Sequence, residues 1–160
     1  MTSTIPTAAE LTELVRSLVR QHRGERGPLL EILHAVQEQL GYVDPAVVPL
    51  LAAELNLSRA DVHGVVTFYR DFRSAPPGRT TIRLCRAEAC ASLGAEQLVR
   101  AAEQALGIGV GETTADGATT LDEVFCLGNC ALGPSAQING RVRGRVDVRQ
   151  LLAAARGGGR

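Results

Sequence analysis

Two adjacent prolines and a glycine interrupt the chain near its middle, at Pro76-Pro77-Gly78. A proline inside a helix loses a hydrogen bond and clashes with the preceding turn, and the residue before a proline favours an extended backbone. No helix can therefore run through this stretch. We predict a linker over residues 74–79, which divides the 160-residue chain into a domain at 1–73 and a domain at 80–160.

The segment before the linker has the pattern of a helical bundle. Apolar residues recur at intervals of three and four, and polar or proline starts precede each run. The predicted starts are Thr7, Pro28, Asp44 with Pro45, and Ser58. Thr7 and Ser58 each have a carboxylate three residues later, which is the spacing of a capping box. Gly41 fits the position just past the end of the second helix.

The segment after the linker mixes strands with helices. The predicted order is strand, helix, strand, hairpin and helix, over residues 80–84, 94–106, 119–125, 136–143 and 147–155. Asn139-Gly140 separates the two halves of the hairpin, and this dipeptide favours a type I′ turn. Helices followed by a mixed strand and helix segment predict an α+β chain.

Charge and composition exclude several classes of function. The formal net charge is zero and hydrophobic residues make up 45%, which indicates a folded protein without a nucleic-acid partner. The four arginines within 141–149 are interrupted by Asp147, so we interpret them as an exposed hairpin or a docking surface. Residues 1–10 lack the pattern of a secretory signal, and no apolar run reaches about 18 residues. We expect a cytoplasmic protein without membrane insertion.

The chain has four cysteines, spaced as the pairs Cys85/Cys90 and Cys126/Cys130. Each pair follows the end of a predicted strand, so two loops at one edge of a sheet would bring the thiols together. Each iron of a [2Fe-2S] cluster takes two thiolates besides its bridging sulfides, and four cysteine ligands are the usual case. Small residues around the cysteines let backbone N–H groups approach the sulfurs. The pattern therefore favours a [2Fe-2S] cluster on these four residues.

Three other interpretations of the cysteines stay open at this point. Structural zinc also takes four cysteines, in a zinc-stabilised interaction module without a redox role, although zinc ribbons usually have two residues between paired cysteines. Disulfides are disfavoured in the cytoplasm. Four unrelated buried thiols are the last alternative, against which the paired spacing counts.

The cysteine pairs lie within a wider pattern. Gly64-Val-Val-Thr-Phe68-Tyr69 and then Phe72 precede the linker and both pairs. Over about residues 8–150 this pattern resembles the NuoE-type, thioredoxin-like [2Fe-2S] subunit family of NADH dehydrogenases. The family includes subunits of respiratory complex I, of NAD-linked hydrogenases and of soluble NAD-dependent formate dehydrogenases. The residues between the cysteines look most like the formate dehydrogenase gamma subunit, whereas complex I members more often carry Thr and Pro within the first pair.

The resemblance implies a fold, a role and partners. The fold would be an N-terminal helical bundle followed by a thioredoxin-like [2Fe-2S] ferredoxin domain. The chain would transfer electrons without a substrate site of its own, beside a diaphorase-type subunit that binds FMN and NAD. A large subunit with a molybdenum or tungsten pterin would oxidise formate, and the complex would reduce NAD⁺. Within this frame, Arg86 next to Cys85 is either a positive charge that favours the reduced cluster or a solvated loop arginine.

Overall fold

The computed structural model describes residues 6–157. By its contacts the chain divides into two compact units, Met1–Pro76 and Pro77–Arg160. The boundary between the units falls between the two prolines of the predicted linker. Residues 1–5 and 158–160 lie outside the described part of the chain. Residues 1–5 belong to the segment 1–10, in which the sequence shows no secretory signal. Within residues 6–157, no helix combines the length and the apolar content needed to cross a membrane.

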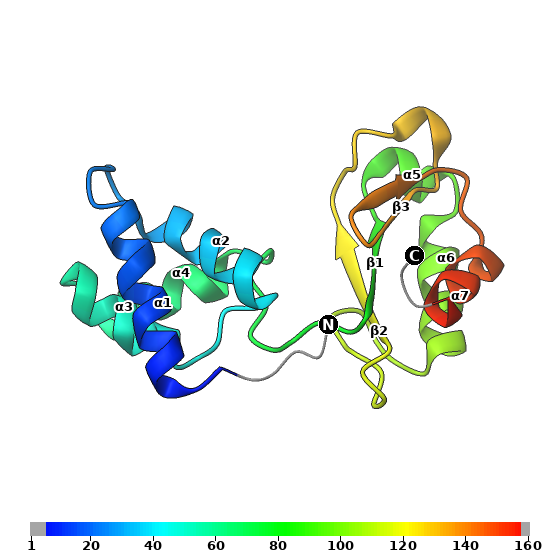
Figure 1. Ribbon diagram of the computed structural model, residues 1–160. Coiled ribbons are helices and arrows are strands. Elements are labelled where there is room, and N and C mark those ends of the chain that lie inside the picture. Colours follow the sequence, from blue (N-terminus) through cyan, green and yellow to red (C-terminus); the bar gives the residue numbers. More distant parts are fainter. Residues whose placement is uncertain (1–5, 158–160) are drawn as a thin grey trace. The chain divides into compact units, whose positions relative to one another are not determined.

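The first unit is a bundle of α-helices (Figure 1), which are α1 (Ala8–Gln21), α2 (Leu29–Leu40), α3 (Val47–Leu55) and α4 (Arg59–Phe68). Both predicted capping boxes form, at Thr7 and at Ser58. Gly41 ends α2 in the left-handed conformation with φ of 84°, as predicted. The bundle core is aliphatic and includes fully buried side chains from every helix, among them Val15, Ile32, Leu33, Val36, Leu51 and Val62.

Two helix starts differ from the prediction. Pro28 is the residue before α2 rather than its first helical position. The third helix begins at Val47, because Asp44 closes a separate turn first. The Asp44 carboxylate accepts the Ala46 N–H at 2.8 Å, and the Asp44 carbonyl accepts the Val47 N–H at 2.8 Å. The aspartate therefore caps the turn that leads into the helix and not the helix itself.

The second unit is a four-stranded sheet in the order β2-β1-β3-β4. Its elements in chain order are β1 (Thr80–Cys85), α5 (Glu88–Ser92), α6 (Ala95–Leu106), β2 (Thr119–Val124), a 3₁₀ turn η1 (Cys130–Leu132), β3 (Ala136–Ile138), β4 (Arg141–Arg143) and α7 (Val148–Arg156). β1 and β2 are parallel, and the other two pairings are antiparallel. This mixed unit after a helical one confirms the α+β class.

Helices α6 and α7 lie on the same side of this sheet (Figure 1), and both contact β1 and each other. The alternation of β1 turns Ile82 and Leu84 toward them, where both side chains are buried. Leu121, which pairs with Ile82, belongs to the same core. Because β1 and β2 run in parallel with Cys85 opposite Val124, both strands end at one edge of the sheet.

The hairpin forms with the predicted turn. Asn139 and Gly140 have φ values of 47° and 80°, the two positive angles that a type I′ turn requires. Asp147 caps α7 and forms a capping box with Gln150. Helix α5 was not predicted, because its five residues are too few to show an apolar periodicity.

Candidate metal centre

The four cysteines lie on two loops at the end of the parallel strands. Cys85 is the last residue of β1, and Cys90 lies in α5. Cys126 comes two residues after the end of β2, and Cys130 begins the turn η1. The first pair is buried, with 2% of each residue exposed, whereas the second pair is exposed. All four are free thiols. The two cysteine loops thus meet at one sheet edge, as their positions after the strands predict.

The thiols are arranged as two pairs. The Sγ atoms of Cys126 and Cys130 are 3.8 Å apart. A tetrahedral ion with metal–sulfur bonds of about 2.3 Å separates two of its sulfurs by about 3.8 Å, so this pair is already spaced to share one metal ion. The hydrogen bond to Cys126 raises the pKa of the Cys130 thiol. Across residues 6–157, no three His, Cys, Asp or Glu side chains are close enough to hold one metal ion together.

Backbone N–H groups surround the Cys85 sulfur. Burial raises the pKa of this thiol, but hydrogen bonds from the N–H groups of Ala87, Cys126 and Leu127 and from the Cys90 thiol outweigh burial, and the pKa is lowered overall. Two of these N–H groups come from the second cysteine loop. The same bonds that stabilise a thiolate at Cys85 therefore also hold the two loops against each other.

Ser135 connects both loops to the sheet. Its backbone N–H and its hydroxyl both interact with the Cys90 thiol, although burial and the neighbouring Cys85 leave the pKa of Cys90 raised. Its carbonyl accepts the Cys85 N–H at 3.0 Å. Its hydroxyl lies 3.1 Å from the Asn129 amide nitrogen and 3.3 Å from the Leu132 carbonyl, and the residue is 1% exposed. The sequence alone indicates only that this serine is near a cysteine.

Glycines let the second loop approach the sulfurs. Gly128 has φ of 70° and donates its N–H to the Cys126 Sγ at 3.4 Å. A Cβ on Gly133 would lie 2.8 Å from the Leu93 Cδ1 and 3.5 Å from the Cys90 Sγ. The small residues around the second cysteine pair therefore do bring backbone close to sulfur, as the sequence predicts.

Arg86 is neutralised by two carboxylates. Its Nη1 lies 2.7 Å from Glu123 Oε2, and its Nε and Nη2 bind the Glu96 carboxylate at 3.0 and 3.2 Å. These bonds, led by that of Glu123, raise the pKa of Arg86. The Arg86 N–H also donates to the Val124 carbonyl at 2.9 Å, which joins the first cysteine loop to the end of β2. Neither glutamate was singled out from the sequence, because nothing in its spacing relates it to Arg86.

Two histidines of the first unit have partners within that unit, and the glycine-rich stretch at 107–111 belongs to a helix end. His22 pairs with Glu25 at 2.9 Å, and the His34 ring lies 4.9 Å from the Phe72 ring. The glycine-rich stretch at 107–111 follows the end of α6 at Gly107, whose φ is 68°. It is therefore a helix end and a loop, and the next element after it is the strand β2.

Known proteins resemble this chain over most of its length. Residues 15–156 match the family described as thioredoxin-like [2Fe-2S] ferredoxin. The chain is 38% identical over 151 residues to the E subunit of the NADH-quinone oxidoreductase of Pseudomonas aeruginosa, a match that covers 90% of this chain and 91% of the relative. It is 33% identical to the HndA subunit of the NADP-reducing hydrogenase of Solidesulfovibrio fructosivorans, over 92% of this chain and 86% of the relative.

A solved structure has a similar backbone. The structure of an NAD⁺-reducing [NiFe]-hydrogenase in the air-oxidized state superimposes with a TM-score of 0.66 and 26% sequence identity. The match covers 81% of this chain but 22% of the hydrogenase chain, so this chain corresponds to a small part of that larger polypeptide.

Proposed function

Because the chain belongs to the thioredoxin-like [2Fe-2S] ferredoxin family, and so carries one [2Fe-2S] cluster, we propose that its four cysteines hold that cluster. The observation that carries this proposal is the arrangement of the thiols as two pairs on adjoining loops. Cys85 with Cys90 would bind one iron, and Cys126 with Cys130 the other. The donor set fits, because iron–sulfur clusters bind thiolates and are tuned by N–H groups directed at sulfur. Family membership favours this cluster over structural zinc.

We propose that the chain is an electron-transfer subunit next to a subunit that binds FMN and NAD. An iron–sulfur cluster supplies one-electron transfer to such a site. The chain's own residues position the cluster and present one side of it, because Cys126 and Cys130 are exposed while Cys85 and Cys90 are buried. The names of the relatives, an NADH-quinone oxidoreductase and a hydrogenase, support this role. A cytoplasmic location is part of the proposal, since reduced cysteines persist there.

The surface beside the exposed cysteines suits a partner protein. Leu93, Phe125 and Leu132 are large apolar residues with 53%, 62% and 42% of their surface exposed. Each lies within three residues of a cysteine. An apolar rim on a metal site is typical of a surface that a second protein covers. We call these three residues the apolar rim and propose that the flavin-binding subunit docks on it.

For the identity of the complex, we propose an NAD-dependent formate dehydrogenase. The support is the residues inside the cysteine pairs, Arg86-Ala-Glu-Ala89 and Leu127-Gly-Asn129, which resemble the gamma subunit of that enzyme. In this complex a large subunit with a molybdenum or tungsten pterin oxidises formate. The second candidate is the equivalent subunit of an NADH-quinone oxidoreductase or of an NAD-linked hydrogenase, which the names of the relatives favour.

One purification tests both levels of the proposal. The chain, tagged in its native host, is isolated with its partners, and the reduced complex is examined by electron paramagnetic resonance. The cluster assignment predicts a rhombic signal that is lost in Cys85→Ser and in Cys126→Ser, and a colourless, zinc-loaded chain would refute it. The formate dehydrogenase assignment predicts NAD⁺ reduction by formate. Reduction by hydrogen, or oxidation of NADH by quinone alone, would establish the second candidate instead.

A further inference from the structure

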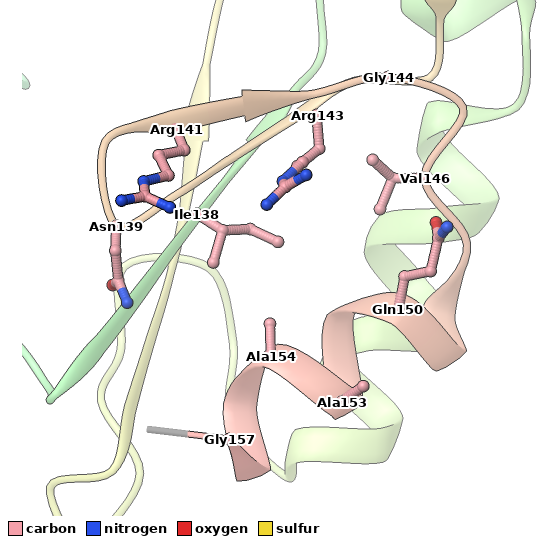
Figure 2. Close-up of a pocket in the computed structure, with 10 residues that line it drawn as sticks. All are labelled: Ile138, Asn139, Arg141, Arg143, Gly144, Val146, Gln150, Ala153, Ala154 and Gly157. Carbon is pink, nitrogen blue, oxygen red and sulfur yellow. The ribbon is translucent and has the colours of Figure 1, made fainter. Parts of the chain in front are cut away.

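A cavity of about 980 Å³ lies between the β3–β4 hairpin and α7, and none of its lining residues is a cysteine. Figure 2 shows the side chains that line it, and among them the Arg143 guanidinium points into the space between the hairpin and α7, while the Arg141 guanidinium lies near Asn139. The polar side chains in its lining are Asn139, Arg141, Arg143 and Gln150. The apolar ones are Ile138, Val146, Ala153 and Ala154.

The cavity follows from the topology of the sheet. Helix α7 packs on β1, while β4 is the edge strand two positions away. Arg141 pairs with Ile138 and Arg143 pairs with Ala136, so both arginines share the face of the sheet that carries α6 and α7. Val142 between them is on the opposite face. The side of β4 that faces α7 is thus left uncovered and carries two positive charges.

The polar side chains in the lining offer mainly hydrogen-bond donors to a ligand. The Asn139 Oδ1 already accepts the Thr81 N–H at 2.8 Å, and the Gln150 Oε1 accepts the Asp147 N–H at 3.0 Å. Their NH₂ groups therefore remain for a ligand. In the described part of the chain, neither the Arg141 nor the Arg143 guanidinium has a hydrogen bond or ion pair with another residue.

No acidic side chain neutralises this donor set. The lining, as far as residues 6–157 show it, contains no Asp or Glu. Asp147 is the only acidic residue between 139 and 157, a stretch with five arginines. Its carboxylate is engaged elsewhere, because it accepts the Gln150 N–H at 2.8 Å and pairs with Arg149 at 3.2 Å. The cavity is therefore a cationic site in a chain of zero net charge.

The volume of the cavity and the spacing of its two arginines limit the class of ligand that it can bind. Small-molecule sites have volumes of roughly 300–1,000 Å³ and are largely apolar with a few placed polar groups, which describes this cavity. The Cα atoms of alternate strand residues, such as Arg141 and Arg143, lie about 6.8 Å apart. At this spacing the two guanidinium groups can bind two neighbouring anionic groups of one ligand. Guanidinium binds phosphate oxygens in a bidentate manner. The small side chains Ala153 and Ala154 leave room on α7 for a flat body.

We propose that this cavity binds a small molecule of the nucleoside diphosphate class, with the diphosphate on Arg141 and Arg143 and the base against Ala153 and Ala154. The site is independent of the cysteines, and the proposal does not rest on the electron-transfer function.

Isothermal titration calorimetry of the full chain tests the proposal, with adenosine diphosphate, pyrophosphate, adenosine monophosphate and malonate as probes. The diphosphate probes are expected to bind more tightly than the monophosphate and the dicarboxylate. The double variant Arg141→Gln/Arg143→Gln is expected to weaken the diphosphates at least about tenfold, since it removes both charges and keeps hydrogen-bond donors. The matched control Arg149→Gln removes one charge from α7 outside the cavity and is expected to leave binding unchanged.

A second variant tests the apolar part of the site without changing its charge. Ala154→Leu fills the floor of the cavity, so it is expected to weaken adenosine diphosphate and to spare pyrophosphate. Circular dichroism confirms that each variant is folded. The proposal is overturned if the diphosphates fail to bind at millimolar concentration, if malonate binds as well as they do, if Arg149→Gln weakens binding as much as the double variant, or if Ala154→Leu leaves the binding of adenosine diphosphate unchanged.

Discussion

The Arg86 guanidinium lies 2.7 Å from the Glu123 carboxylate, and this ion pair joins the residue after Cys85 to the strand that leads to Cys126. Glu96 binds the same guanidinium at 3.0 Å. The positive charge that the sequence predicts beside the cluster is therefore matched by two negative charges. Glu123 is the more enclosed of the two carboxylates, with 16% of its side chain exposed against 42% for Glu96.

The first prediction is that Glu123→Gln raises the reduction potential of the cluster by some tens of millivolts. Reduction adds an electron to a site that already carries negative charge, so removing one nearby carboxylate charge favours the reduced form. The amide oxygen can still accept from Arg86, which preserves the contact between the loops. A redox titration followed by electron paramagnetic resonance measures the shift.

Two further variants complete this experiment. Arg86→Gln is expected to shift the potential in the opposite direction, because it leaves two carboxylates uncompensated. Glu112→Gln makes the same chemical change in the loop after α6, where the carboxylate binds the Gly109 N–H at 2.7 Å, and is the matched control. Equal potentials in the parent chain and Glu123→Gln would show that this charge does not influence the cluster.

The second prediction concerns Ser135, whose hydroxyl is buried between the Asn129 amide and the Leu132 carbonyl. Ser135→Ala leaves these groups without their partner and is expected to lower the free energy of unfolding by about 1–3 kcal/mol. It is also expected to speed the loss of the cluster to a chelator, because the loop that carries Cys130 loosens. Urea denaturation and the decay of the visible absorbance measure the two effects.

Ser92→Ala is the control for this variant. Ser92 also lies near a cysteine and its hydroxyl donates to the Ala89 carbonyl at 3.0 Å, but the residue is exposed. Water can replace that bond, so the change in stability is expected to stay within about 0.5 kcal/mol. If both variants behaved alike, burial of the Ser135 hydroxyl would not be what stabilises the loop.

Local sequence signals predict most helices and turns of this fold correctly. They do not predict contacts between residues that are distant in the sequence. The capping boxes at Thr7 and Ser58 and the turn at Asn139-Gly140 were read correctly because each depends on residues within four positions. Asp44 was misassigned because an aspartate caps a turn as readily as a helix.

The sequence predicts that the two cysteine loops meet, but it does not predict which other residues contact the thiols. Paired spacing at strand ends indicates which thiols meet, because parallel strands end at one sheet edge. The partners of those thiols come from elsewhere in the chain. Ser135 is 45 residues from Cys90, and Glu123 is 37 residues from Arg86, so only the folded sheet brings them together.

The third prediction is a pH dependence at the start of α7. The Gln150 N–H, followed by Arg149, lowers the pKa of the Asp147 carboxyl. A carboxyl whose pKa is lower in the folded state stabilises the fold above its unfolded pKa, and this contribution is lost as the pH falls through the folded pKa. Asp147→Asn is therefore expected to be less stable than the parent at neutral pH, and the difference is expected to shrink in acid.

Urea denaturation of the cluster-free chain at a series of pH values checks this, because acid would otherwise release the cluster. Asp122→Asn is the control. It removes a carboxylate from β2, so it shows how the loss of one negative charge away from a helix start changes the free energy of unfolding with pH. A gap between Asp147→Asn and the parent that stays constant from neutral pH into acid would contradict the assigned cause.

The last prediction tests the apolar rim. Phe125 precedes Cys126 and has 62% of its surface exposed. Exposing this apolar surface to water is unfavourable, and a docked partner would bury it. Phe125→Glu is expected to weaken the binding of the FMN- and NAD-binding subunit at least about tenfold, as aromatic residues at the centre of an interface do. The cluster signal is expected to persist, because the Phe125 side chain is not a ligand.

Val142→Glu is the control for this variant. It replaces another exposed apolar residue, on the edge strand β4, and is expected to leave the binding of the flavin subunit intact. Surface plasmon resonance with the separately purified flavin subunit compares them, and equal losses in both variants would place the docking surface away from the cysteines.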